Sequence, residues 1–522
     1  MHAVHAFLAL KSDDDWGGLP AKLGLEDRRP LRALLEDYRA LGALGCIVEA
    51  PYIDRDFSAA FTAFYAGLFH PYRKDCTRVH FFGADVSPLE HEADAVVRAS
   101  NIAALQPNYL GYAVLRPLRH APISSAVVTC STDVAVRAPY KVHLLGAELL
   151  VIGAPLTQQD TRVGACAQAS IWTVGRHFHQ RHGASWFSMP AISDLALTPT
   201  DGTLSTSLPQ GSSFLRLDNM VRALRAMDRS PVVYAAKGVT AQDQLIWDRP
   251  TPSEVVTRYV DSGIPVIFVL RPKGPDLIGH AVVAVGFKKT QAVDLTSLAD
   301  APTLAAGLSE FLINDDQRGA YLSLPIDAAP TANDWALNAD CTQLIVPLPG
   351  KVFVPAETAD VLARDVVVQI EAARSTGRLV APKRTDFEPA QLLSLASNAV
   401  VSRTYLTYGW KYKARALRNE LSAEFKAVVA TKLLPRFVWV TEFSLPSLAF
   451  NTDQCSRKVI AHVVVDATGS KFWNSVLLAE VPGVGLELTP SGYLDFATDR
   501  VDPYYGKIRG EMDFEHCAVS KA

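Results

Sequence analysis

The hydrophobic pattern divides the chain into three stretches of different character. In the first, residues 1–150, apolar side chains recur at helical spacing over 31–41 and 58–69. Short apolar runs bounded by polar and proline-containing turns predict strands at 46–48, 77–82, 111–118, 124–130 and 140–153. We therefore expect an N-terminal α/β region with a β-rich second half.

The second stretch, residues 151–330, has the clearest helix signals. A helix is predicted over 165–182, with Gly183 as its stop. Thr251-Pro252-Ser253-Glu254 combines a threonine cap, a proline in the first turn and a glutamate three residues after the cap, and the helix that it opens should end at Gly263. Strands are predicted at 264–270, 280–287 and 311–313.

The third stretch, residues 331–522, follows a connection rich in proline, alanine and asparagine. Amphipathic helices are predicted over 359–374 and 412–432. Strands are predicted at 437–443, 459–465 and 476–481. This pattern is typical of a further α/β domain.

Composition narrows the class of protein. Of the 522 residues 49% are hydrophobic, and the net charge is -3, so neither nucleic acid nor an anionic membrane is expected as a partner. No apolar run is as long as a membrane span, and the start lacks a basic segment followed by an apolar one. The seven cysteines are odd in number and not in CxxC spacing, which argues against disulfides and structural zinc. A cytoplasmic setting follows.

One cysteine lies where a thiol becomes a nucleophile. Cys166, in Gly164-Ala165-Cys166-Ala167, would occupy the first turn of the helix predicted over 165–182. The unpaired N–H groups of a first turn and the helix dipole favour a thiolate there, and a neighbouring imidazole would stabilise it as an ion pair. A cysteine in an alanine-rich helix is otherwise a small buried hydrophobe.

His280 is the best candidate for that imidazole. It opens the strand Gly279-His280-Ala281-Val282, whose start can present a side chain to a cleft. A third group should orient the ring through its other nitrogen. Asn314, Asp315 or Asp316 could do so at the end of the next strand, and Asp315 is our choice.

A carbonyl under attack also needs hydrogen-bond donors for its developing oxyanion. The backbone N–H of Cys166 is one, because the amides of a first turn have no partner within the helix. Gln159, in Gln158-Gln159-Asp160 upstream, is the predicted second donor through its side-chain amide. As an ordinary loop residue it would instead cap the helix.

The order of these residues resembles the papain-like cysteine peptidase superfamily, and the bacterial C39-type leader peptidases in particular. The resemblance implies an α+β core in which the cysteine helix packs on an antiparallel sheet that bears the histidine, flanked by two α/β-type domains. It implies Cys166 as nucleophile, His280 as base, Asp315 as orienting residue and Gln159 in the oxyanion role. The likeness is confined to residues 151–330, and Ala-Cys-Ala-Gln-Ala replaces the papain-type Cys-Gly-Ser-Cys-Trp.

The predicted function is a thiol-dependent hydrolase that cleaves a peptide or isopeptide bond of a peptide or protein substrate through a thioester. Two alternatives stay open: acyl transfer or deamidation by the same residues, and a non-catalytic scaffold that binds protein. No cofactor and no metal is expected, since His179 and His182 lack further ligands at a suitable spacing and fit a solvated helix end. The oligomeric state is left open.

Overall fold

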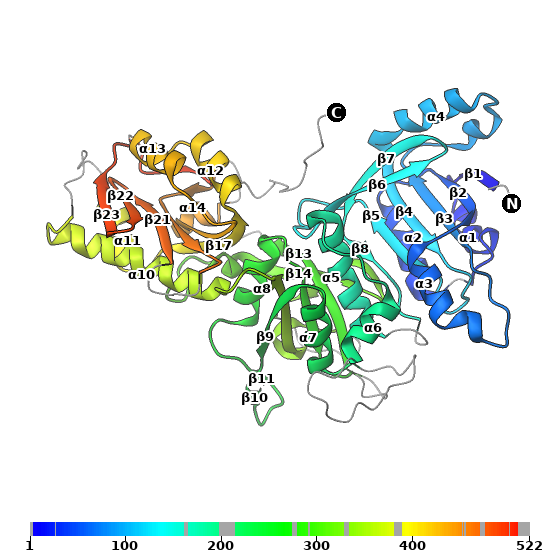
Figure 1. The fold of residues 1–522 in the computed structure, drawn as a ribbon, viewed down its shortest axis with the longest axis horizontal. Coiled ribbons are helices and arrows are strands. Elements are labelled where there is room, and N and C mark those ends of the chain that lie inside the picture. Colours follow the sequence, from blue (N-terminus) through cyan, green and yellow to red (C-terminus); the bar gives the residue numbers. More distant parts are fainter. Residues whose placement is uncertain are drawn as a thin grey trace.

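Three six-stranded sheets lie in a row in the computed structural model of the protein (Figure 1). We call each sheet, together with the helices that pack on it, the N-terminal, the central or the C-terminal unit. The structure describes residues 4–26, 28–160, 165–197, 215–273, 279–290, 293–327, 334–379, 389–451, 453, 456–469, 475–500 and 502–509. Helices and strands are mixed throughout, as expected.

The N-terminal unit is an antiparallel sheet in the order β1-β2-β3-β4-β5-β8. Its strands are β1 Val4–Ala9, β2 Gly45–Tyr52, β3 Cys76–Phe82, β4 Tyr109–Leu115, β5 Ile123–Val128 and β8 Pro155–Leu156. Leucines of α1 (Asp13–Lys22) and α2 (Arg29–Ala40) form a buried cluster with the sheet. The helices α3 (Arg55–Ala63) and α4 (Ala95–Ala104) complete the unit.

The segment 140–153, predicted as strand, is a hairpin of β6 (Ala138–Leu144) and β7 (Ala147–Gly153). Leu145 and Gly146 turn the chain with φ values of 48° and 87°. The hairpin packs apolar side chains on the N-terminal sheet in a second buried cluster. Alternation alone did not reveal the turn, since leucine is an uncommon residue at positive φ.

The central sheet is antiparallel in the order β15-β14-β13-β12-β16-β9. Its strands are β9 Arg229–Ala235, β12 Val266–Leu270, β13 His280–Lys289, β14 Leu308–Asp315, β15 Gly319–Pro325 and β16 Cys341–Pro349. Its helices are α5 Cys166–His182, α6 Met189–Leu197, α7 Leu217–Ala226 and α8 Pro252–Asp261. Consecutive residues along most of β13 are buried, so both of its faces are covered.

The helix signals of the central stretch are confirmed. Thr251 caps α8 and Glu254 returns the contact, while Gly263 follows at a φ of 74°. The domain limits at 150 and 330 remain a prediction, and two strands pair with a sheet on the other side of these limits. β8 pairs with β5 of the N-terminal sheet, and β16 lies between β12 and β9 of the central sheet.

The C-terminal unit is an antiparallel sheet in the order β17-β18-β20-β21-β22-β23. Its strands are β17 Val401–Tyr408, β18 Phe437–Ser444, β20 Ala461–Asp466, β21 Val476–Val481, β22 Val484–Thr489 and β23 Gly492–Ala497. The helix α10 (Ala356–Ser375) agrees with its prediction, whereas 412–432 forms two helices, α12 (Gly409–Arg418) and α13 (Ala423–Thr431). The break arises because Ser422 caps a new helix.

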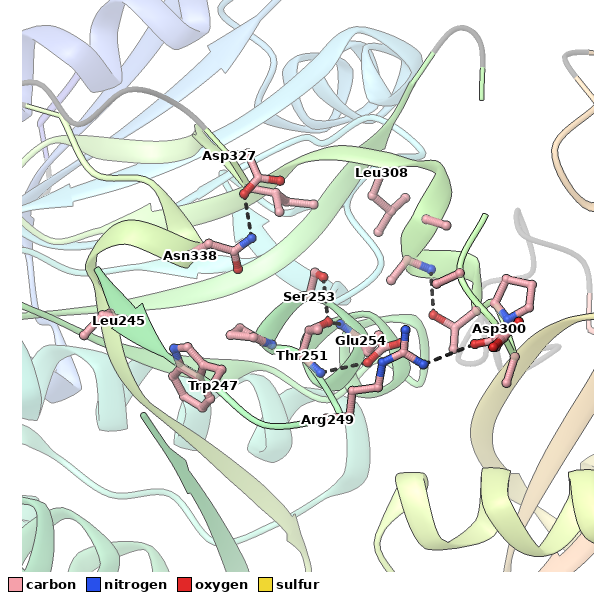
Figure 2. A pocket seen from close by; sticks show the side chains of 18 residues that line it. Leu245, Trp247, Arg249, Thr251, Ser253, Glu254, Asp300, Leu308, Asp327 and Asn338 are labelled. Atoms are coloured by element: carbon pink, nitrogen blue, oxygen red, sulfur yellow. Dashed lines mark hydrogen bonds between the residues drawn. The ribbon is translucent and has the colours of Figure 1, made fainter. Parts of the chain in front are cut away.

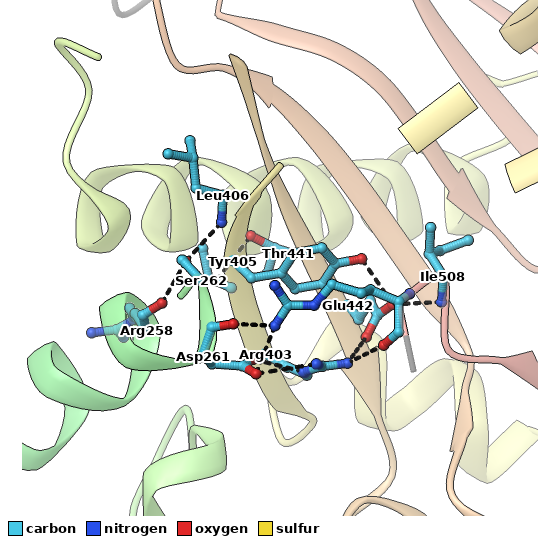
Figure 3. A network of polar contacts seen from close by, with 11 residues as sticks. Arg258, Asp261, Ser262, Arg403, Tyr405, Leu406, Thr441, Glu442 and Ile508 are labelled. Atoms are coloured by element: carbon cyan, nitrogen blue, oxygen red, sulfur yellow. Dashed lines mark hydrogen bonds and ion pairs between the residues drawn. The ribbon is translucent and has the colours of Figure 1, made fainter. Parts of the chain in front are cut away.

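A buried ionic network joins the end of α8 to the C-terminal sheet (Figure 3). Asp261 accepts hydrogen bonds from Arg403 at 2.8 and 3.2 Å and from Arg509 at 2.7 Å. Glu442 accepts from Arg403 at 3.1 Å and from the backbone of Ile508 at 2.6 Å. Ser262 accepts from the backbone of Leu406 at 2.8 Å. The network therefore fixes the C-terminal unit to the central one through paired charges.

Candidate functional site

Cys166 is the first residue of α5, as predicted. The cap residue Ala165 is extended and offers no side-chain acceptor, and Gln168 Oε1 accepts from the Ala165 backbone N–H at 3.2 Å. The Cys166 amide therefore belongs to an uncapped first turn, where N–H groups are free of helical partners. Cys166 is partly exposed, and Gly164, the first residue of the motif, lies outside the described residues.

Packing of α5 on β13 brings the cysteine beside the histidine. Ser170 Oγ donates to the backbone carbonyl of Ala281 at 3.0 Å, next to His280 at the start of the strand. Cys166 is one of the groups that raise the pKa of His280, as a hydrogen-bonding neighbour of the ring does. His280 Nε2 is 2.9 Å from Asp315 Oδ1.

Asp315 is the one of the three candidates that hydrogen-bonds His280. It is 1% exposed, and its Oδ1 also accepts from the backbone of Gln317 at 2.9 Å. Asn314 uses both ends of its amide elsewhere, because Nδ2 donates to Pro155 at 3.0 Å and Oδ1 accepts from the Tyr321 backbone at 3.1 Å.

Asp316 adds a second carboxylate beside the ring. Its Oδ1 is 4.0 Å from His280 Nε2, and its oxygens make no well-formed hydrogen bond to the described residues. Burial raises the pKa of Asp316 to about 7, and the charge of Asp315 acts in the same direction. The charge of His280 and the Gln159 backbone act in the opposite direction and lower the pKa.

The surroundings of His280 favour the charged imidazolium. Burial lowers its pKa, but hydrogen bonds to Asp315 and Cys166 and the charges of Asp315 and Asp316 outweigh that effect and raise the pKa to about 10. The ring therefore holds its proton at neutral pH. A positive ring beside a thiol is the arrangement that stabilises a thiolate.

Gln159 lies in a loop whose neighbours are held firmly. Gln158 is bound to the N-terminal unit through its backbone and side chain, and Asp160 accepts from Tyr65 at 2.8 Å. The Gln159 side chain makes no hydrogen bond to the described residues and does not cap α5. Just before this loop, the Pro155 carbonyl accepts a hydrogen bond from Asn314 Nδ2 at 3.0 Å, next to Asp315.

Trp335 is a site residue that the sequence did not indicate. Its ring stacks on His280 with centroids 5.3 Å apart and planes at 25°, and Arg318 lies 5.7 Å above the tryptophan. The tryptophan therefore covers one face of the His280 ring. Trp335 follows the connection assigned to the third stretch, so no spacing signal linked it to Cys166.

His280, Asp315 and Asp316 could also hold a metal ion, because one potential ligand atom from each lies within 4.8 Å of the others. A proton between Nε2 and Oδ1 accounts for the short contact equally well. The histidines of α5 have other partners: His177 is buried, whereas His179 is half-buried and His182, at the helix end, is exposed. His177 contacts Gly263, His179 contacts Ala184 and His182 contacts Tyr408, at 3.1, 2.6 and 2.9 Å.

A separate cavity of about 500 Å³ lies at the start of α8 (Figure 2). Trp247, Arg249 and Glu254 line one side, and Asp327, bonded to Asn338 at 2.7 Å, lines another. None of Cys166, His280, Asp315 and Gln159 borders it. The candidate site and this cavity are therefore different places.

No protein-family model and no curated protein matches the chain. Among solved structures, the peptidase domain of Streptococcus ComA, a bi-functional ABC transporter involved in a quorum-sensing pathway, is similar over 37% of this chain and 96% of that domain. The sequence identity is 16% and the TM-score is 0.21. This similarity is too weak to assign a fold or a function to this chain.

None of the described helices is both long and apolar enough to cross a membrane.

Proposed function

We propose that the protein is a papain-like thiol hydrolase with Cys166 as nucleophile, His280 as proton donor and acceptor, and Asp315 as the residue that orients His280. One observation supports the proposal: the helix that starts at Cys166 packs on the strand that starts at His280, and His280 is hydrogen-bonded to the buried Asp315 at 2.9 Å. A peptide or isopeptide bond of a peptide or protein substrate is the proposed target.

The reaction follows from these atoms. The thiolate of Cys166 attacks the carbonyl carbon, and the electron pair of the C=O bond moves to oxygen. The Cys166 N–H and the Gln159 side-chain amide donate hydrogen bonds to that oxyanion. When the C–N bond breaks, the leaving nitrogen takes the proton of His280 and a thioester remains. Water then gives a proton to His280, its oxygen attacks the thioester carbonyl, and the thiolate departs.

The same thioester can pass its acyl group to an amine or alcohol, so acyl transfer and deamidation use the same residues. The scaffold alternative predicts a Cys166 no more reactive than the other thiols. Three other cysteines provide the contrast. Burial raises the pKa of Cys46 to about 12, and it also raises the pKa values of Cys76 and Cys341. A cysteine that reacts rapidly at neutral pH can therefore be distinguished from these three.

The test is competitive alkylation with iodoacetamide at pH 7, followed by peptide mapping of each cysteine. We expect Cys166 to react at least about tenfold faster than Cys46 or Cys341, and His280→Ala to remove that advantage. His182→Ala is the control, since it removes an imidazole from the opposite end of the same helix, where it contacts Tyr408, and leaves the His280–Asp315 contact intact. Equal rates for Cys166 and Cys46 in the wild type would rule out the hydrolase.

A further inference from the structure

The loop that carries Gln159, residues 157–160, is bound to the N-terminal unit on both sides of that glutamine. Thr157 Oγ1 donates to the Ser124 carbonyl at 2.8 Å. The Gln158 backbone N–H donates to the Ile123 carbonyl at 3.2 Å, and the Gln158 side-chain oxygen accepts from the Ile123 amide at 3.2 Å. Beyond Gln159, Tyr65 donates its hydroxyl proton to Asp160 Oδ2 at 2.8 Å.

Arg116 connects the two halves of this anchorage. Its Nη2 donates to the Gln158 carbonyl at 2.6 Å, and its Nη1 lies 4.0 Å from Asp160 Oδ2. Arg116 and Tyr65 are 6% and 2% exposed, while the Asp160 side chain is 3% exposed. Water therefore competes little for these contacts, and hydrogen bonds to charged groups are the strong ones in such surroundings.

Gln159 itself is the exception within the loop. Its side chain makes no hydrogen bond to the described residues. Asn314, next to Asp315 in the central unit, donates its Nδ2 to the Pro155 carbonyl at 3.0 Å, which ties the chain just before this loop to the strand end that carries Asp315. The anchored neighbours determine where Gln159 lies, yet they leave its amide available. An oxyanion donor stabilises charge only when it is held in position before the reaction, since reorganisation would consume the gain.

We infer that the N-terminal sheet is part of the active site, with Tyr65 and Thr157 as positioning residues that hold Gln159 for the oxyanion. This rests on the proposed function. Neither residue contacts the reacting atoms, and both act through the loop. The consequence is that the central unit by itself has the Cys166 N–H but lacks a fixed second oxyanion donor.

Two reactions of Cys166 separate positioning of the donor from activation of the thiol. Alkylation by iodoacetamide displaces iodide at a saturated carbon and forms no oxyanion. Cleavage of p-nitrophenyl acetate passes through a tetrahedral oxyanion and releases p-nitrophenolate. A residue that acts through Gln159 alters the second reaction and leaves the first unchanged.

We expect Tyr65→Phe and Thr157→Val in the full chain to lower kcat/KM for p-nitrophenyl acetate about tenfold, with alkylation of Cys166 within about twofold of the wild type. Tyr38→Phe is the matched control. It removes another buried tyrosine hydroxyl of the N-terminal unit, one that donates to the carbonyls of Tyr112 and Val127 and not to the loop. This variant should keep wild-type cleavage.

A double-mutant cycle with Gln159→Ala distinguishes positioning from general destabilisation. In that background Tyr65→Phe should cause no further loss of cleavage. Losses that multiply, or equal losses in Tyr65→Phe and Tyr38→Phe, would overturn the inference. A fall in alkylation equal to that in cleavage would also overturn it, because the thiol itself would then be affected.

Hydrogen exchange gives a readout that does not need catalysis. Amides of residues 157–160 should exchange faster in Tyr65→Phe than in the wild type and in Tyr38→Phe. If the wild type shows no Cys166-dependent cleavage, the proposed function fails, and exchange alone then decides the positioning claim. Unchanged exchange in Tyr65→Phe would refute it.

Discussion

The Nε2 atom of His280 lies 2.9 Å from Oδ1 of Asp315, and the two residues are 6% and 1% exposed. A buried carboxylate is costly unless a charge or a hydrogen bond compensates it. The imidazolium supplies both, so each member of the pair depends on the other. This mutual dependence has consequences for protonation and for stability.

The pKa of His280 should be far above that of other buried histidines. NMR of imidazole carbons should show His280 protonated at pH 8 and losing its proton near pH 10, since the contacts with Asp315 and Cys166 and the charge of Asp316 outweigh the effect of burial. Asp315→Asn should lower this pKa by at least about one unit. His462 is the internal reference, because burial lowers its pKa to about 3. A midpoint for His280 near 6.5 would contradict the prediction.

The same shift makes stability depend on pH. The pKa of His280 is higher in the folded chain than its ordinary value of 6.5, so the folded state binds more protons between pH 6.5 and about 10. The stabilisation is complete below pH 6.5 and is lost as the pH rises through 10. The free energy of unfolding of the wild type relative to His280→Gln should fall over that range by on the order of 4 kcal/mol. Denaturant titrations at several pH values measure it, and a difference that grows with pH would be the opposite result.

Gly286 lies in the strand that begins with His280, where a side chain has no room. A Cβ there would lie 2.3 Å from the Asp133 carbonyl oxygen and 2.9 Å from the Val134 Cα. Gly286→Ala should therefore lower the free energy of unfolding by about 1–3 kcal/mol through overpacking. Gly238→Ala is the control, because a Cβ there meets nothing within 4 Å. Similar denaturation midpoints for the two variants would show that the segment around Asp133 can move aside without loss of stability.

Asp261 should be essential for the contact between the central and C-terminal units. Asp261→Ala leaves Arg403 and Arg509 buried without the carboxylate that both bind, and should cost about 3–5 kcal/mol. Glu148→Gln, in an exposed pair with Lys141, should cost less than about 1 kcal/mol. Urea denaturation followed by tryptophan fluorescence compares them. If both variants unfold at the same urea concentration, the buried network contributes no more than a surface pair.

Local patterns predicted the elements that present the candidate site. The helix over 165–182 and the strand from His280 were predicted because a glycine stop and apolar periodicity are local signals. The same reasoning failed at 140–153 and 412–432, where a turn at Leu145–Gly146 and a cap at Ser422 interrupt runs that look continuous. Periodicity reports the exposure of side chains and does not report where the chain reverses.

The sequence by itself determined the chemical types available: a thiol at a helix start, an imidazole at a strand start, and three polar residues, 314–316, after a further strand. Only the tertiary structure decided which of those three meets the histidine. Asn314 and Asp315 point to opposite sides of β14, so the register of that strand on β13 and β15 sends one into the fold and the other to His280. Asp316 and Trp335 approach His280, and Tyr65 binds the loop that carries Gln159, through contacts between distant segments that no local pattern encodes.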